Sequence, residues 1–193
     1  MDFLIHLDHV IFQFINQTLA SPWQDFFFPA ITDLHKQLAF KCIAYPLLMA
    51  FYFYRYKKMG FLYFLFCALT LSFTDWSGNV FIKQNVMRDR PFLVTEVHAI
   101  QRSPAHGFSF TSNHSSNMFA FATYCSAFFP EARFVFFGVA ALIAYSRVYN
   151  GVHFPLDVIC GALWGIAMAL LFIRLARWSA QKLYIVRRAK ESP

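Results

Sequence analysis

Charged residues are scarce in this sequence: Asp, Glu, Lys and Arg make up only 14% of its 193 residues. An average soluble domain has about 25% charged residues, which keep its surface hydrated. Hydrophobic residues instead make up 58% of the chain, and 26 residues are Phe. This composition excludes a disordered chain and a collagen-like repeat, and it favours an integral membrane protein over a soluble one.

Paired cysteines are also lacking. The sequence has no CxxC pattern and no Cys/His spacing that suggests a metal or redox pair. Each cysteine lies alone within an apolar stretch, which excludes a disulfide scaffold and predicts small buried hydrophobic residues. These cysteines are Cys42, Cys67, Cys125 and Cys160.

No Lys or Arg precedes Lys36, and the first residues lack the basic region and the small-residue cleavage site of a signal peptide. We therefore expect no cleaved leader. The segment Phe3–Leu19 has apolar residues at helical spacing with polar residues between them. This pattern predicts an amphipathic helix in the membrane interface, with a sixth membrane crossing as the alternative.

Five stretches are apolar enough to contribute a membrane crossing, which takes about 20 residues per helix. They are Leu38–Tyr54, Gly60–Phe81, Met118–Phe129, Phe134–Tyr145 and Val158–Ile173. We predict an all-α integral membrane protein with five or six transmembrane helices in a single domain over residues 1–193. Its expected parts are an N-terminal amphipathic segment (1–35), a transmembrane bundle (36–176) and a basic cytoplasmic tail (177–193).

The 17 basic residues outnumber the 10 acidic ones. Short loops that hold Lys and Arg stay in the cytoplasm, and Arg55, Lys57 and Lys58 mark one such loop. The segment after the last apolar stretch is basic as well. Topology therefore explains much of the excess positive charge, and we expect no nucleic-acid partner. Two polar segments are left on the outer side, residues 82–113 and 146–154, and a functional site should lie there.

The first polar cluster runs from Lys83 to Pro91. Lys83 and Arg90 are seven residues apart, so on a helix they would share one face, and Pro91 is expected to end that helix. Arg88 and Asp89 are expected to pair with each other, with an added contact to the phosphate as the alternative. A positively charged helix end that snorkels to the interface is the alternative interpretation.

An acidic residue precedes this cluster. Asp75 lies about two helical turns before Lys83 within an apolar stretch. A carboxylate at that position can partly balance the positive charge of this cluster from the side of the preceding helix.

The second cluster, Ser109–Asn117, is dense in Ser, Thr and Asn immediately before an apolar run, which predicts a helix start. The first backbone N–H groups of a helix favour an anion. His114 lies at this helix start. An ordinary helix cap with a buried histidine is the alternative.

The third cluster is Ser146–Asp157. Pro155 suits the first turn of a helix, which places His153 just before it and Asp157 one helical turn after His153. A carboxylate there can orient one imidazole nitrogen and leave the other as a base or nucleophile. Arg147 belongs to the same outer rim. A structural ion network is the alternative.

Together the clusters read Lys83-x6-Arg90-Pro91, Ser112-x-His114 and Ser146-Arg147-x5-His153-x3-Asp157. This arrangement resembles the three-part signature of the type 2 phosphatidic acid phosphatase (PAP2) family over roughly Gly60 to Ile173. The resemblance implies a PAP2/haloperoxidase-like helical bundle. The related vanadium haloperoxidases share such a site, but soluble enzymes would not be this apolar.

The resemblance also implies a phosphatase that acts on lipid phosphates or diphosphates with no metal and no other cofactor. His153 would be the nucleophile that forms a phosphohistidine, Asp157 would orient it, and His114 would protonate the leaving oxygen. The phosphate would be held by Lys83, Arg90, Ser112, Asn113 and Arg147.

The chemistry of phosphoryl transfer fits these roles. Charge spreads over the equatorial oxygens, and fixed cations with a helix N-terminus supply the stabilisation that Mg²⁺ supplies elsewhere. These roles require that His153 is neutral when it attacks and that His114 is protonated when it donates a proton, so their pKa values should lie apart.

The middle motif departs from the family pattern. The family usually has Pro-Ser-Gly-His, whereas this chain has Thr111-Ser112-Asn113-His114. Asn tolerates left-handed backbone geometry better than most residues. We expect Asn113 to preserve the backbone and to add a side-chain donor for the phosphate.

A site at headgroup level meets the phosphates of bilayer lipids first, so a membrane lipid phosphate is the expected partner. The small outer loops favour a polyprenyl (undecaprenyl) diphosphate. Lipid A phosphate, phosphatidylglycerophosphate and phosphatidate stay open as substrates. The alternatives of another class are a non-catalytic lipid-binding protein and an anion transporter. We expect a multi-pass protein of a bacterial inner (plasma) membrane with its site facing the periplasm.

Overall fold

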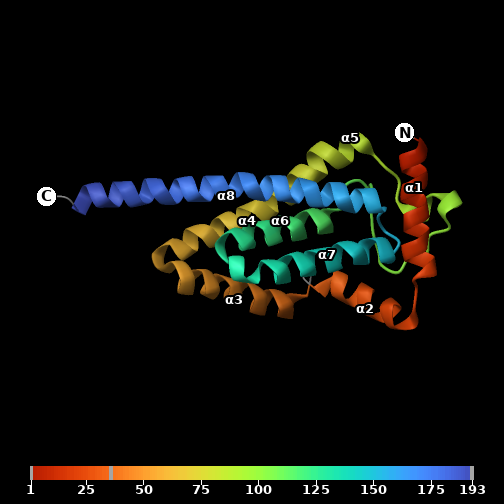
Figure 1. Cartoon of the computed structure of the whole chain (residues 1–193), viewed down its shortest axis with the longest axis horizontal. Coiled ribbons are helices and arrows are strands. Elements are labelled where there is room, and N and C mark those ends of the chain that lie inside the picture. The colour runs from red at the N-terminus through yellow and green to blue at the C-terminus, as the bar shows by residue number, and fades with distance from the viewer. Residues whose placement is uncertain (1, 35–36, 192–193) are drawn as a thin grey trace.

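The computed structural model describes residues 2–34 and 37–191, and the regular secondary structure of these residues is helical. The main helices run side by side along the long axis of the molecule (Figure 1). α6 is the central helix, because it contacts α4, α7 and α8. The helices of this bundle are α3 (Leu38–Tyr56), α4 (Gly60–Ser77), α6 (Asn113–Phe128), α7 (Arg133–Tyr149) and α8 (Pro155–Glu191).

Two N-terminal helices lie at one end of this bundle. α1 (Asp2–Gln13), extended by a π-helical turn at Phe14–Thr18, crosses the bundle end (Figure 1). α2 (Pro22–Thr32) then turns back and packs against α7. The expected amphipathic helix Phe3–Leu19 corresponds to α1 and its π-helical turn, whereas α2 was not predicted.

The two faces of α1 differ in chemistry. Asp8, Phe12 and Asn16 are spaced four residues apart on the buried face. Phe3 and Leu4 on the other side are 74% and 58% exposed. Asp8 and Asn16 therefore face the protein, and the exposed apolar side chains are left for contact with lipid.

Three segments of the described chain contain a window long and apolar enough to cross a membrane. They are Leu38–Leu93, Pro130–Tyr149 and Pro155–Ile185. The first of them contains both α3 and α4, which are separated by a turn at Lys57–Met59. These helices support the membrane character of the protein, and the expected number of five or six crossings stays a prediction.

Several boundaries differ from the expected ones. α7 continues to Tyr149, so Arg147 lies on its last turn and not in an outer loop. After α4 the chain continues through a π-helical segment (Gly78–Lys83) and a short α5 (Gln84–Val86). That helical run ends at Val86, because Met87 has a left-handed φ of 49°.

The expected shared helix of Lys83 and Arg90 is therefore wrong: Arg90 lies in an extended segment beyond the helix end. Pro91 does not end the helix but begins a short 3-10 turn, Pro91–Leu93. At the C-terminal end, α8 runs through to Glu191 without a break at residue 176. The boundary expected between residues 35 and 36 lies outside the described residues.

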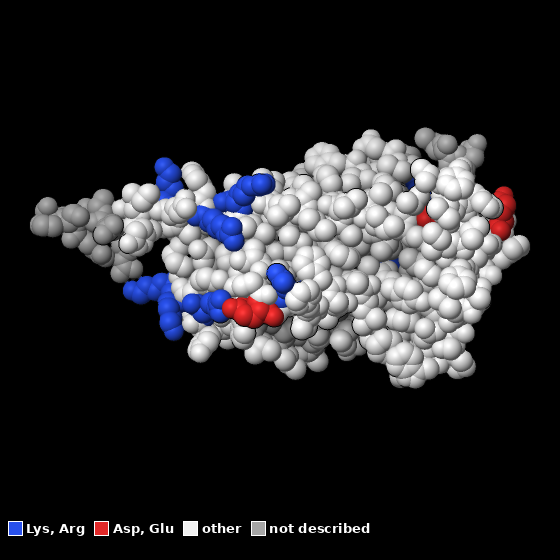
Figure 2. Space-filling view, in the orientation of Figure 1, with Lys and Arg blue, Asp and Glu red and all other residues white. Residues whose placement is uncertain are grey.

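Basic side chains gather at the end of the bundle away from α1, around the α3–α4 turn and along α8 (Figure 2). Arg55, Lys57 and Lys58 belong to that turn. Arg55 also forms an ion pair with Glu131, with a distance of 2.9 Å between Nη2 and Oε1. The two ends of the bundle thus differ in charge as well as in structure.

Close contact between α6 and α8 holds the centre of the bundle. A Cβ atom on Gly165 would lie 2.0 Å from the backbone oxygen of Ser116, and one on Gly161 would lie 2.7 Å from that of Ser112. Small residues allow helix backbones to approach this closely in membrane proteins. The approach fixes the start of α6 against the first turns of α8.

We therefore expect Gly165→Ala to destabilise the protein. The added methyl group must push α8 away from the backbone of α6, and overpacking of this kind costs about 1–3 kcal/mol. Gly138→Ala is the matched control, because a Cβ atom there meets nothing within 4 Å. Thermal unfolding in detergent should show a lower Tm for Gly165→Ala and an equal or higher Tm for Gly138→Ala. Equal values for both variants would contradict the packing argument.

Candidate active site

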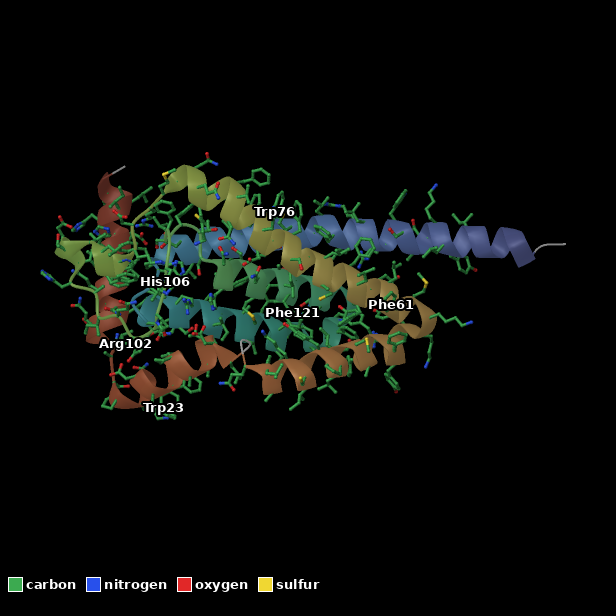
Figure 3. The ribbon with its side chains drawn as sticks, turned by 180° about the vertical axis from the view of Figure 1, so that it is seen from behind. Trp23, Phe61, Trp76, Arg102, His106 and Phe121 are labelled. Atoms are coloured by element: carbon green, nitrogen blue, oxygen red, sulfur yellow. The ribbon has the colours of Figure 1, made fainter. Side chains whose placement is uncertain are left out.

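The three polar clusters meet at the end of the bundle that α1 covers. His153 lies in the loop between α7 and α8 and is 2% exposed. Figure 3 shows Arg102 and His106 among the side chains that crowd this end, whereas Phe61 and Phe121 lie along the bundle. The candidate site therefore lies at one end of the bundle, beside α1.

The two imidazole nitrogens of His153 face different partners. Nδ1 lies 3.6 Å from Oδ2 of Asp157, just beyond hydrogen-bonding distance. Nε2 lies 3.4 Å from Nη1 of Arg90. Burial lowers the pKa of His153 to about 3; Asp157 opposes this shift, and the charges of Arg90 and Arg147 add to it. The imidazole is therefore neutral, as the sequence predicts for the nucleophile.

The carboxylate of Asp157 is fully buried and has a partner on each oxygen. Oδ2 accepts hydrogen bonds from the backbone N–H of Phe154 at 2.8 Å and from the hydroxyl of Ser109. Oδ1 accepts from Nη1 of Arg88 at 2.7 Å. Ser109 begins the second cluster, but its hydrogen bond to Asp157 was not predicted, since a serine in a polar loop gives no distinct signal.

Arg90 is held by backbone carbonyl groups. Nε donates to Gly107 at 2.8 Å, Nη1 to Val152 at 2.7 Å and Nη2 to His106 at 2.8 Å. These contacts fix the guanidinium beside His153. Among the described residues no carboxylate forms an ion pair with it, so its positive charge is not compensated by a direct ion pair there.

Lys83 and Arg90 meet through one carbonyl group and not through a shared helix face. Nζ of Lys83 donates to the oxygen of Phe108 at 3.0 Å, and Nη2 of Arg90 donates to the same oxygen at 3.3 Å. The loop before α6 therefore brings the two cations of the first cluster together.

Ser112 joins the second cluster to the third. It is the N-cap of α6, and its hydroxyl oxygen accepts from the N–H of Ser115 at 3.5 Å. Its own N–H donates to the backbone oxygen of Asp157 at 3.0 Å. The start of α6 is thereby fixed to the helix that carries Asp157.

The side chain of Asn113 is engaged by an acidic residue of α4. Its Nδ2 donates to Oδ1 of Asp75 at 3.0 Å, and Nδ2 of Asn117 donates to the same oxygen at 3.1 Å. Nδ2 of Asn79 approaches the other oxygen at 3.3 Å. Asp75 thus binds two amides of α6 and one of the π-helical segment Gly78–Lys83.

The backbone of Asn113 needs no left-handed geometry. It is the first residue of α6, and the non-glycine residues with positive φ in the described chain are Lys57, Met87 and His98. The freedom that glycine would give is therefore not required at this position.

His114 and Arg147 lie against the C-terminal end of α2. Nε2 of His114 is 3.5 Å from Oδ1 of Asp33. Nη1 of Arg147 donates to the hydroxyl of Thr32 at 2.9 Å. The neighbouring residues Thr32 and Asp33 thus bring the second and third clusters together. Their role was missed, because α2 was not predicted.

The expected pairing of Arg88 with Asp89 is wrong. Arg88 instead forms ion pairs with Asp157 at 2.7 Å and with Asp8 of α1 at 2.6 Å. The buried carboxylate of Asp8 was not recognised as part of the site. The sequence did contain a feature that points to Asp8: it is an acidic residue within an apolar helix, where a charge is costly unless it is paired.

The donor set here suits an anion better than a cation. Within residues 2–34 and 37–191, no three side chains of His, Cys, Asp or Glu are grouped so that they could hold a metal ion. The expectation that no metal takes part in catalysis stays a prediction.

Comparisons with known proteins identify the family of this chain. The family model of the PAP2 superfamily matches residues 59–181. The lipid A 4′-phosphatase of Bacteroides thetaiotaomicron is 30% identical over 173 residues, which are 86% of this chain and 75% of that protein.

Two solved structures have the same fold, each with a TM-score of 0.65. Aquifex aeolicus LpxE is 28% identical, and the match covers 85% of this chain and 93% of that one. The transmembrane PAP2-type phosphatidylglycerolphosphate phosphatase of Bacillus subtilis is 25% identical, and the match covers 94% of this chain and 88% of that one.

These relatives confirm the expectation of an enzyme over a lipid-binding protein or an anion transporter. The chain belongs to the PAP2 superfamily and is a membrane lipid phosphatase of that family.

Proposed function

We propose that this phosphatase acts through a phosphohistidine on His153, without a metal ion. The observation that carries the proposal is the environment of His153. Its imidazole is buried and neutral, Nδ1 faces Asp157 at 3.6 Å, and Nε2 faces the guanidinium of Arg90 at 3.4 Å. With the proton held on Nδ1, Nε2 has the lone pair that a nucleophile needs.

The cations beside this nitrogen would bind the phosphate. Nη1 of Arg90 lies 3.4 Å from Nε2 of His153 and would bind one phosphate oxygen, and Lys83 and Arg147 would hold the other oxygens. Guanidinium groups bind phosphate oxygens through a planar fork, while an ammonium group acts as a point charge.

The start of α6 would complete the phosphate site. Ser112 caps this helix, and its first N–H groups have no partner within the helix. Asn113 would contribute its backbone N–H, since its side-chain amide donates to Asp75.

The reaction would take two steps. In the first, Nε2 of His153 attacks phosphorus, the bond between phosphorus and the lipid oxygen breaks, and the leaving oxygen takes a proton from His114. In the second, His114 takes a proton from water, the water oxygen attacks phosphorus, and the nitrogen–phosphorus bond breaks. Inorganic phosphate leaves and both histidines return to their starting states. Asp33, 3.5 Å from His114, is placed to orient the imidazole ring.

For the substrate, we propose a lipid A-like phosphate. The support is the lipid A 4′-phosphatase that matches 86% of this chain. The expectation of a polyprenyl diphosphate rested on small outer loops. α1 and α2 add structure at this end of the bundle, which weakens that argument (Figure 1). Polyprenyl diphosphate, phosphatidylglycerophosphate and phosphatidate stay as alternatives to be tested beside it.

We further propose that the site faces the periplasmic side of a bacterial inner membrane, in a bundle of five or six crossings. The basic residues at the opposite end of the bundle support this orientation, because loops with Lys and Arg stay in the cytoplasm (Figure 2).

We expect the purified protein to release phosphate from lipid A in excess EDTA, with a higher kcat/KM than for the three alternatives. His153→Ala should lower the rate by at least about 10³-fold, because the nucleophile is lost. His114→Gln should lower the rate as well, since the first step then lacks its acid and the second step lacks its base. Loss of activity in EDTA would contradict the metal-free mechanism. Activity that survives in His153→Ala would contradict the role of His153.

The low pKa of His153 predicts that acid destabilises the protein. Burial lowers this pKa from 6.5 to about 3, so between these values the unfolded chain binds a proton that the folded protein does not. Stability is therefore fully present above pH 6.5 and falls as the pH drops toward 3, by up to about 1.4 kcal/mol per pH unit.

Thermal unfolding at about pH 7.5 and about pH 5 tests this expectation. The wild type should lose more Tm over this range than His153→Gln, which cannot titrate at this position. His6→Gln is the control, because His6 is exposed on α1, and it should behave like the wild type. The same loss of Tm in His153→Gln as in the wild type would show that His153 is not held neutral by burial.

Asn113→Gly should leave kcat/KM within about threefold of the wild type, because the side-chain amide faces Asp75 and not the phosphate site. Asn117→Ala, which removes another amide from Asp75, is the matched comparison and should behave similarly. A large rise in KM in Asn113→Gly alone would show that the Asn113 side chain binds the phosphate.

A further inference from the structure

A chain of buried charges runs from the N-terminal helix to His153. Nη2 of Arg88 donates to Oδ2 of Asp8 at 2.6 Å, and Nη1 of the same guanidinium donates to Oδ1 of Asp157 at 2.7 Å. The side chains of Asp8 and Asp157 are 0% exposed, and that of Arg88 is 21% exposed. One guanidinium thus bridges the carboxylate beside His153 to a second carboxylate on α1.

Asp8 also contacts the start of α8. Its Oδ1 accepts a hydrogen bond from the backbone N–H of Leu156 at 2.8 Å. Leu156 lies in the first turn of the helix that carries Asp157, where backbone N–H groups need partners outside the helix. Asp8 therefore fixes Arg88 relative to the helix from which Asp157 projects.

Phe154, the residue after His153, is contacted by Arg88 and by His9 of α1. The guanidinium of Arg88 lies over the ring of Phe154, with 4.1 Å between its central carbon and the ring centroid. The imidazole of His9 stacks with Phe154, with ring centroids 5.0 Å apart and an interplanar angle of 22°. These contacts restrict the loop of His153 through its neighbour.

We propose that Asp8 and Arg88 are positioning residues for His153. They touch no reacting atom; they fix the direction of the Asp157 carboxylate and, through it, the tautomer and orientation of the imidazole. α1 lies outside residues 59–181, the region matched by the family model. Catalysis in this protein thus depends on a carboxylate from outside the three motifs. The kinetic test of this proposal rests on the proposed function.

The kinetic test uses Asp8→Asn, Arg88→Gln and the double variant. In each, kcat for lipid A should fall at least about tenfold, as is usual when a partner of a site residue is lost. KM should stay within about threefold, because the phosphate-binding cations are unchanged. Since both residues act through Asp157, the double variant should be no slower than the slower single variant. If the fold losses in kcat of the two single variants multiply in the double variant, the two residues do not both act through Asp157, and the proposal is contradicted.

A second ion pair of the N-terminal helices provides the matched control. Nε of Arg102 lies 2.5 Å from Oδ1 of Asp25, which ties α2 to the loop before α6 without a contact to Asp157. Asp25→Asn should therefore keep kcat within about twofold of the wild type. An equal loss of kcat in Asp25→Asn and Asp8→Asn would show that both pairs only anchor the N-terminal helices, and the proposal would be wrong.

Arg88→Lys separates geometry from charge. Lysine keeps the positive charge, but a single ammonium group cannot reproduce the planar bridge between two carboxylates. We expect it to recover only part of the activity lost in Arg88→Gln. Full recovery would show that charge balance alone matters, which would overturn the positioning role.

Histidine NMR tests the proposal independently of turnover. With ¹⁵N-labelled histidine and His153→Gln to assign the signal, wild-type His153 should have its proton on Nδ1. Asp8→Asn and Arg88→Gln should shift the proton toward Nε2, and Asp25→Asn should not. An unchanged tautomer in both variants would overturn the proposal. If Arg88→Gln fails to fold, Asp8→Asn carries the test alone, since it leaves the contact between Arg88 and Asp157 in place.

If the wild type releases phosphate from none of the lipids, the proposed function fails. The NMR comparison still decides the positioning proposal in that case, because it needs no substrate.

Discussion

The buried carboxylate of Asp157 is the interaction on which the rest of the site depends. A charge without access to water is costly unless it is paired and hydrogen-bonded. Asp157 meets this requirement through Arg88, Ser109 and the N–H of Phe154. These partners come from different parts of the chain, so satisfying one carboxylate brings the loop before α6 and the histidine loop together. The orientation of the imidazole beside it follows from this assembly.

The N-terminal helices show how a membrane protein closes such a site. α1 directs Asp8 and Asn16 toward the protein and leaves large apolar side chains exposed. In a soluble protein this arrangement would be unfavourable, but at a bilayer the apolar face has lipid to contact. The polar face can then contact the site. Asp8 on this face accepts hydrogen bonds from Arg88 and from the backbone N–H of Leu156 at the start of α8.

Asp75 and Arg90, an acidic and a basic residue near the site, are both held by uncharged groups. The carboxylate of Asp75 accepts hydrogen bonds from neutral amides of α6 and of the π-helical segment Gly78–Lys83. It therefore fixes the start of α6 without forming an ion pair with the cations of the site. Arg90, in turn, is held by backbone carbonyl groups, and among the described residues it forms no ion pair with a carboxylate. Its charge stays available for an anion because carbonyl oxygens orient a guanidinium without neutralising it.

The sequence by itself determined the membrane class, the positions of the main helices and the residues of the three motifs, because apolar composition and motif spacing are local properties of the chain. Only the tertiary structure decided the partners of these residues. Arg90 does not belong to the predicted helix, because that helix ends before Met87, which has a left-handed backbone. Arg88 forms an ion pair with Asp8 and not with its neighbour Asp89. Asp8 and Leu156 are far apart in sequence, and their contact exists because packing places α1 across the start of α8. Local spacing cannot encode a contact of that kind, since it depends on where separate helices pack.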